Sequence, residues 1–332
     1  MQYLFPEIND LQGVTEHFHT IYGGNTFFNS FRVIERNKDT SIISTSEVKK
    51  EFLNRFISKP NMTLGLNFET PIVMGILNVT PDSFYDGEES FSERQFVEKG
   101  LGLLNNGCRI LDIGGESTRP GAMEVLSSTE IERVVGVIEK IKKSVPSAII
   151  SIDTRKAVVA EKALQSGASM VNDISAGSFD KKMFNVVAKY KAGMCLMHSQ
   201  GLPENMQREP HYENVLLDIY DYLEDKITEA ERNGIPREKI MIDPGIGFGK
   251  NFSHNMEIIK KTSLFLGLGC PLMLGLSRKR FIGEIISERL PSARLAGSIA
   301  AMLKTLNNGV NIIRVHDVKE TADAMKVWSV LK

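Results

Sequence analysis

With 332 residues, the chain can hold one large domain or two smaller ones, and its 42% apolar and 24% charged content is typical of a soluble globular protein. A formal net charge of −1 gives no reason to expect nucleic acid or an acidic membrane surface as a partner. Three cysteines without a CxxC spacing argue against a disulfide framework, and no uncharged run is long enough to cross a bilayer, so we expect a cytoplasmic protein.

Residues 1–68 differ in pattern from the rest of the chain. They carry scattered aromatic residues and a strand-like run at 31–36. A helical pattern follows, with cap candidates at 44–46 and Glu47 in its first turn. The prolyl segment at 59–61 then indicates a break. We predict a small N-terminal α/β extension or cap, of unknown role.

Short apolar runs alternate with helical patterns from residue 69 to the end of the chain. Ser92 followed by Gln95 has the spacing of a capping box, and so has Ser127 followed by Glu130. The apolar runs lie at 72–77, 110–113, 148–152, 170–171, 194–197, 240–242, 272–276 and 312–315.

Eight apolar runs separated by helices are what a (β/α)8 TIM barrel requires, and the length of 69–332 suits that fold. The rival architecture is an open doubly wound sheet, but no GxGxxG motif follows the first run. We therefore predict an α/β protein with a barrel over 69–332 and the extension over 1–68.

A polar group stands at the end of each predicted strand, where barrel enzymes place their sites. Taken singly, each has an ordinary structural explanation. Asp153 suits a helix N-cap, His198 a hydrogen-bonded core histidine, and Lys279 a solvated surface lysine. Eight polar strand ends together are hard to assign to chance. These residues are Asn78, Asp112, Asp153, Asn172, His198, Asp243, Lys279 and Arg314.

The residue types indicate a ligand with two chemical parts. Carboxylates and amide oxygens accept hydrogen bonds from amino and ring N–H groups, and lysine donates to a carbonyl or ring nitrogen. That mixture suits a flat polar heterocycle such as a guanine-like or pterin ring, and it is offered by Asp112, Asn172, Asp243 and Lys279. A second set offers donors and fixed cations for a phosphate group, with an amide oxygen for Mg²⁺: Asn78, Thr118, Arg119, Arg314 and His316.

Five motifs in order carry a resemblance to a known family. They are Asn78-Val-Thr-Pro-Asp-Ser-Phe, Asp112-Ile-Gly-Gly-Glu-Ser-Thr-Arg-Pro-Gly, Asp243-Pro-Gly-Ile-Gly-Phe-Gly-Lys, Ser277-Arg-Lys and Arg314-Val-His316. From about residue 71 to 332 the chain resembles the dihydropteroate synthases. The resemblance implies a transferase of folate biosynthesis that joins p-aminobenzoate to 6-hydroxymethyl-7,8-dihydropterin pyrophosphate and releases pyrophosphate. The run at 198–201 departs slightly from the family pattern, and residues 1–68 exceed the family core.

The resemblance also implies a role for each matched residue. The pterin would be bound by Asp112, Asp153, Asn172, Asp243 and Lys279. The pyrophosphate would be bound by Asn78, Thr118, Arg314 and His316, with Asn78 also on Mg²⁺. The p-aminobenzoate pocket would be formed by Phe84, Thr118, Arg119, Pro120, Phe248 and Ser277. The residues implied in catalysis are Asn78, Asp82, Arg119, Lys279, Arg314 and His316.

The implied mechanism is dissociative, so it needs no strong nucleophile or general base. Pyrophosphate leaves first, assisted by cations and Mg²⁺, and the aromatic amine attacks a stabilised pterin methylene cation. Asp112 and Asp243 would favour the positive charge on the ring. Mobile loops at 80–87 and 117–121 would close over the site and exclude water, with Asp82 ordering the first loop and the ion. Sulfonamides would compete as mimics of p-aminobenzoate.

Three other functions compete with this one. A methyl-folate-dependent methyltransferase shares the pterin-binding barrel but has no need of Arg314 and His316. A barrel aldolase could use Lys279 for a Schiff base, although its arginine neighbours fit an anion or heterocycle clamp better. A non-catalytic pterin-binding paralogue is the third. We also expect a homodimer, as is common in the family, with 290–306 as a candidate interface.

Overall fold

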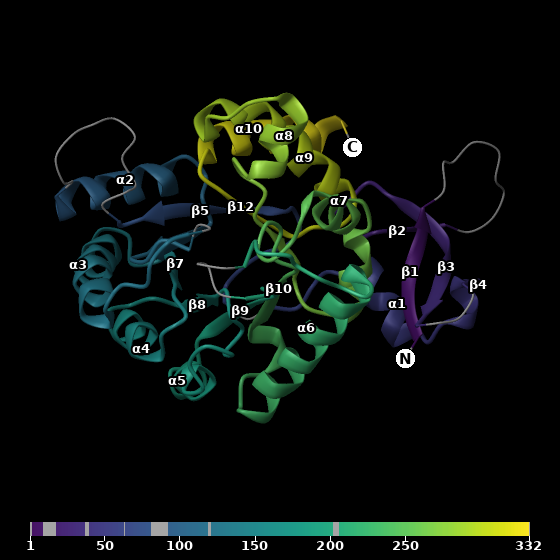
Figure 1. The fold of residues 1–332 in the computed structure, drawn as a ribbon, viewed down its shortest axis with the longest axis horizontal. Coiled ribbons are helices and arrows are strands. Elements are labelled where there is room, and N and C mark those ends of the chain that lie inside the picture. Colours follow the sequence, from purple (N-terminus) through teal and green to yellow (C-terminus); the bar gives the residue numbers. More distant parts are fainter. Residues whose placement is uncertain are drawn as a thin grey trace.

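The computed structural model describes residues 2–8, 18–36, 40–62, 64–80, 92–118, 121–201 and 206–331. Within them, eight parallel strands form one sheet in the order β10-β9-β8-β7-β6-β5-β12-β11. A parallel bridge between Ile242 and Leu272 joins β10 to the start of β11, so the sheet closes into the predicted barrel (Figure 1). The strands are β5 (Ile72–Asn78), β6 (Ile110–Gly114), β7 (Ile149–Asp153), β8 (Met170–Asp173), β9 (Gly193–Met197), β10 (Ile240–Asp243), β11 (Met273–Leu274) and β12 (Ile312–Val315).

The helices that follow the strands surround the barrel (Figure 1). They are α2 (Glu93–Asn105), α3 (Ser127–Ser144), α4 (Ala157–Gln165), α5 (Met183–Lys189), α6 (Val215–Arg232), α7 (Phe252–Lys260), α8 (Arg280–Ile286), α9 (Leu295–Asn307) and α10 (Val318–Leu331). Short 3-10 helices η3 (Arg237–Lys239), η4 (Thr262–Leu268) and η5 (Pro291–Arg294) lie between them. Among the described residues, none of these helices has the length and apolar character that crossing a bilayer requires.

The two predicted capping boxes have different outcomes. At α2 the box is confirmed, because the Ser92 backbone N–H donates to Gln95 Oε1 at 2.8 Å. At α3 the box is wrong, although the helix does begin at Ser127. Leu126 is the N-cap residue there, and no side chain caps it. The Glu130 carboxylate is buried instead and accepts a hydrogen bond from the Lys156 ammonium.

A short segment, described at residue 62 and at 64–68, fills the N-terminal end of the barrel. Met62, Leu66 and Phe68 are buried in one apolar cluster with inward-facing strand residues. The approach is close, because a Cβ added at Gly193 would lie 2.2 Å from Leu64 Cδ1. The strand members of this cluster are Ile72, Met74, Ile110, Met170, Cys195, Met241, Met273 and Ile312. This end of the barrel is therefore a packed core, and a ligand site is left to the other end.

The N-terminal residues fold into an antiparallel sheet and one α-helix beside the barrel (Figure 1). The elements are β1 (Gln2–Ile8), β2 (His19–Thr20), β3 (Phe27–Glu35), β4 (Ser41–Ser44), η1 (Thr45–Glu47) and α1 (Lys50–Ile57). The helical pattern expected from 44–46 is thus a 3-10 turn, capped by Ser44 and Glu47, followed by a separate α-helix.

The extension is fastened to the barrel helices by packing and by charge. The rings of Phe28, Phe31 and Phe56 pack together within the extension. The Tyr3 ring lies edge-on to the Tyr220 ring of α6, with 5.5 Å between the centroids. On α6, the Asp221 carboxylate accepts from Tyr3 Oη at 2.7 Å and from Arg36 Nη2 at 2.8 Å. The division at residue 68 stays a prediction, and Met62, Leu66 and Phe68 belong by their packing to the barrel interior.

Candidate active site

Polar side chains from neighbouring strands meet inside the C-terminal end of the barrel. Residues two positions apart in a strand face the same side. Asp112 therefore follows the inward-facing Ile110 into the interior, where its side chain is completely buried. Arg314 Nε donates to Asp112 Oδ2 at 2.6 Å, and Arg314 Nη2 donates to Asp153 Oδ2 at 2.6 Å. One guanidinium thus pairs with two buried carboxyl groups, which explains an aspartate inside an apolar strand.

The same cluster contains hydrogen-bond acceptors that the protein itself does not use. Asn172 Nδ2 donates to Asp112 Oδ2 at 3.1 Å, and this bond uses neither Asp112 Oδ1 nor Asn172 Oδ1. Asp112 Oδ1, Asp153 Oδ1 and Asn172 Oδ1 are buried without a hydrogen-bond partner among the described residues, as is Ser151 Oγ. Buried polar atoms normally have partners. These acceptors are therefore suited to the N–H groups of a ligand.

Ser151 is a site residue that our sequence reasoning missed. It lies two positions before Asp153 in β7, so both side chains face the barrel interior. In the parallel register it stands opposite Asp112 of β6. The alternation of β7, polar at both inward positions and apolar between them, was the signal that could have identified it.

Burial changes the ionisation of two carboxyl groups here, those of Asp153 and Asp243. It raises the pKa of Asp153 to about 7, against the opposing charge of Arg314. It also raises the pKa of Asp243, against the charge of Lys279 and a hydrogen bond from the Gly245 backbone N–H to Asp243 Oδ1 at 2.7 Å. Ligand N–H donors would therefore stabilise carboxylates that are costly to keep ionised in the protein alone.

Lys279 and Phe248 form one wall of the site. The Lys279 ammonium donates to the Ile246 carbonyl and lies 4.9 Å from the centroid of the Phe248 ring. Burial lowers the pKa of Lys279 to about 8, although the charge of Asp243 opposes this. Lys279 is thus held beside the carboxylate cluster and is not a solvated surface lysine. The shared role of Lys279 and Asp243 in pterin binding stays a prediction.

Lys250 anchors the loop that carries Phe248. Its buried ammonium donates to the Phe248 carbonyl at 2.9 Å and lies 2.9 Å from His198 Nδ1. Burial lowers the pKa of both Lys250 and His198 well below their ordinary values. His198 is thus a buried core histidine that pairs with Lys250, which is the ordinary structural explanation suggested by the sequence. The loop also requires Gly245, whose φ is +72° and whose Cβ would lie 1.9 Å from the His198 carbonyl oxygen.

Ser277 and His316 join the ends of β11 and β12 at the rim. Ser277 Oγ lies 3.0 Å from His316 Nδ1 and accepts the His316 backbone N–H at 3.3 Å. Asn78 ends β5, opposite Gly114 in the parallel register. Thr118 is half-buried two residues after the buried Glu116. The predicted site residues Asp82, Phe84, Arg119 and Pro120, and most of the loop at 80–87, lie outside the described residues.

The contacts of Arg314 differ from those that the two-part ligand hypothesis predicts. That hypothesis grouped it with phosphate-binding residues, apart from the heterocycle group. Its guanidinium instead contacts Asp112 and Asp153, so the two predicted groups meet at this side chain. A role for Arg314 on pyrophosphate stays a prediction. Among the described residues, no cluster of three or more His, Cys, Asp or Glu side chains could hold a metal ion.

The fold and this site define a (β/α)8-barrel enzyme with a small-molecule site at the C-terminal ends of its strands. The family described as "Pterin binding enzyme" matches residues 74–316. Dihydropteroate synthase of Escherichia coli K12 is 43% identical over 262 residues, 79% of this chain and 92% of that protein. A Xanthomonas albilineans dihydropteroate synthase structure with 4-aminobenzoic acid has a TM-score of 0.77 and 39% identity, covering 82% of this chain and 98% of that one.

A second structure of the Xanthomonas albilineans enzyme, in complex with 7,8-dihydropteroate, has a TM-score of 0.73 and 38% identity. It covers 80% of this chain and 95% of that one. The chain belongs to the pterin-binding enzyme family and, within it, to the dihydropteroate synthases. The resemblance inferred from the sequence motifs is confirmed, and so is the barrel.

Proposed function

We infer that the chain catalyses the dihydropteroate synthase reaction of folate biosynthesis. It joins p-aminobenzoate to 6-hydroxymethyl-7,8-dihydropterin pyrophosphate and yields 7,8-dihydropteroate and pyrophosphate. Membership of the family supports this function. The observation that carries it in the structure is the set of buried, unpartnered acceptors on Asp112, Asp153 and Asn172. A pterin presents amino and ring N–H groups, which are the donors that such acceptors require.

The residues of the cluster suggest how the ring is held. Asp112 and Asn172 would accept from the ring N–H groups, and Lys279 would donate to the ring carbonyl or a ring nitrogen. Hydrogen bonds to charged groups contribute about 1.5–3 kcal/mol each, more than neutral ones. The methyl-folate methyltransferase also uses a pterin, so this part of the site does not distinguish the two functions. Family membership does.

We propose a dissociative reaction at this site. The bond from the pterin methylene carbon to the pyrophosphate oxygen breaks, and the electron pair leaves with pyrophosphate. The amine nitrogen of p-aminobenzoate then forms a bond to the methylene carbon and loses a proton. Carboxylates beside the ring, on Asp112 and Asp243, favour the positive charge that develops on it. Arg314 and His316 would face the departing anion, a role that stays a proposal.

A magnesium ion is proposed from the donor chemistry of Asn78. The ion takes oxygen ligands, keeps several waters, and is usually held by one or two protein groups together with substrate phosphates. One half-buried amide oxygen at the end of β5 fits that pattern. When bound, Mg²⁺ would neutralise charge on the pyrophosphate. Calorimetry of pyrophosphate binding tests this: Mg²⁺ should strengthen binding to the unaltered chain and strengthen it less in Asn78→Ala.

The decisive assay for the function supplies dihydropterin pyrophosphate, p-aminobenzoate and Mg²⁺ to the purified protein. We expect dihydropteroate and pyrophosphate in equal amounts. Pterin binding without turnover would instead favour the non-catalytic pterin-binding paralogue. Transfer of a methyl group from methyl-folate would favour the methyltransferase.

We also propose a homodimer and a cytoplasmic location. Near the predicted interface at 290–306, the apolar side chains of Ile285, Ile286 and Leu290 are 58%, 44% and 58% exposed. Exposed apolar side chains in one region suit a protein interface. Light scattering coupled to gel filtration should give twice the chain mass, and Leu290→Glu should reduce it. The three free cysteines, all buried, are consistent with a reducing compartment.

A further inference from the structure

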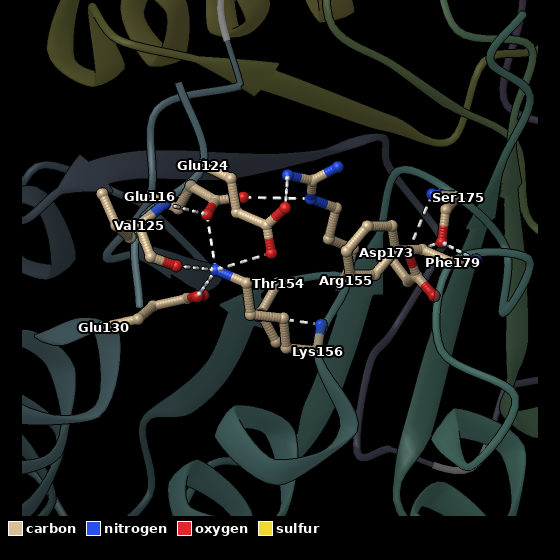
Figure 2. A network of polar contacts seen from close by, with 10 residues as sticks. All are labelled: Glu116, Glu124, Val125, Glu130, Thr154, Arg155, Lys156, Asp173, Ser175 and Phe179. Carbon is tan, nitrogen blue, oxygen red and sulfur yellow. Dashed lines mark hydrogen bonds and ion pairs between the residues drawn. The ribbon is translucent and has the colours of Figure 1, made fainter. Parts of the chain in front are cut away.

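A buried cluster of charged side chains lies between β6, β7 and α3, outside the acceptor cluster described above (Figure 2). Glu116 follows β6, Arg155 and Lys156 follow β7, and Glu130 lies in α3. Their side chains are between 1% and 7% exposed. Burying charges is costly unless they are paired and hydrogen-bonded. The sequence motifs singled out the segment around Glu116, but the proposed reaction uses none of these four side chains.

The cluster holds the two sides of one loop together. Glu116 accepts hydrogen bonds from Lys156 Nζ, from Arg155 Nε at 3.0 Å and from the Val125 backbone N–H at 3.0 Å. Lys156 Nζ also donates to the Val125 carbonyl at 2.6 Å and to Glu130 at 2.9 Å. Both backbone groups of Val125 are thus bound by the same ion pair. Figure 2 shows the Lys156 ammonium between Glu116, Glu130 and Val125.

Glu116 and Val125 are nine residues apart, and Thr118 lies between them. The carboxylate and the ammonium therefore determine how the segment leaves β6 and where it returns towards α3. Although burial alone would raise it, hydrogen bonds and the charge of Lys156 lower the pKa of Glu116, so the group remains a carboxylate. Lys156 stands three residues after Asp153, which belongs to the acceptor cluster. The end of β7 thus contacts both the ligand cluster and the loop.

We propose that Lys156 and Glu116 are positioning residues for the second substrate, which act by fixing the segment that carries Thr118. The proposal rests on the proposed function and on the contact with p-aminobenzoate that the family resemblance implies for Thr118. The pterin acceptors stand on β6, β7 and β8. Arg314 holds Asp112 and Asp153, and Asn172 donates to Asp112. Loosening the ion cluster therefore weakens p-aminobenzoate binding and leaves pterin binding nearly unchanged.

A Lys156→Met/Glu130→Gln double variant tests the proposal while keeping the net charge of the cluster. We expect the KM for p-aminobenzoate to rise about tenfold or more, the factor that corresponds to one charge-assisted hydrogen bond. The Kd for the pterin, measured by calorimetry, should stay within about twofold. Lys226→Met is the matched control, because this lysine on α6 is 12% exposed and pairs with Glu229. The KM for p-aminobenzoate and the Kd for the pterin should not change in Lys226→Met.

Two further variants keep the test informative. Lys156→Arg retains a donor cation and should restore most of the lost p-aminobenzoate affinity. Glu116→Gln retains the acceptor for the Val125 N–H and should weaken p-aminobenzoate binding even if the double variant does not fold. Equal losses for both substrates, or unchanged affinity for p-aminobenzoate, would overturn the proposal. Titration of p-aminobenzoate into protein saturated with pterin and pyrophosphate gives the same answer without turnover, so failure of the reaction itself is seen separately.

Discussion

Replacing Arg314 with methionine removes the guanidinium that Asp112 and Asp153 share, while much of the apolar stem remains. Both ion pairs have N–O distances of 2.6 Å, and the Arg314 side chain is only 20% exposed. Removing one partner of a buried ion pair costs about 3–5 kcal/mol, because the remaining charge is left uncompensated. We expect the free energy of unfolding at pH 8 to fall by about that amount.

The loss should be smaller at pH 6. Burial raises the pKa of Asp153 to about 7, against the charge of Arg314, and an unfolded aspartate has a pKa of about 3.9. A carboxyl with a raised folded-state pKa contributes stability at low pH and loses that contribution as the pH rises through the folded value. Without Arg314 this pKa rises further. A further rise of one pH unit makes the loss at pH 8 larger than that at pH 6 by about 1 kcal/mol.

Urea denaturation followed by circular dichroism at the two pH values measures this. In Asp153→Asn/Arg314→Met the extra carboxylate is absent, so part of the loss at pH 8 should be recovered. Arg237→Met is a matched control, because its ion pair with Glu231 is 37% exposed on both sides and should contribute about 1 kcal/mol or less. Equal losses at both pH values, with no recovery in the double variant, would refute the electrostatic reasoning.

Three other outcomes follow from the site and the barrel core. Pterin affinity should fall as the pH rises above about 8, because burial lowers the pKa of Lys279 to about 8 against the charge of Asp243. Calorimetry across pH 7–10 measures this affinity, and Lys279→Arg should make it nearly independent of pH. Asp243→Asn should weaken pterin binding about tenfold or more through loss of a charge-assisted hydrogen bond, and unchanged affinity in a direct titration would remove Asp243 from the site. Phe68→Ala should lower the free energy of unfolding by about 3–5 kcal/mol without changing either KM, since Phe68 fills the opposite end of the barrel.

Much of the architecture could be predicted from local patterns. Each apolar run that the sequence showed is a barrel strand, because a parallel strand buried on both faces is predominantly apolar. In the structure, the alternation of side chains along β6 puts Asp112 on the same inner face as Ile110. The predicted capping box at α3 is wrong because a distant residue binds Glu130. The spacing of Ser127 and Glu130 is a local pattern, but the Glu130 carboxylate accepts a hydrogen bond from Lys156, which is 26 residues away in the chain.

The sequence by itself determined the eight strands of the barrel and the family to which the chain belongs. Period and motif order are properties of the chain, and they suffice for both. Only the tertiary structure decided which partners meet. Arg314 reaches Asp112 across 202 residues and Asp153 across 161, and Lys156 binds both ends of the loop after β6. These pairs depend on how the sheet closes, and strand periodicity specifies a face without specifying the side chain opposite it.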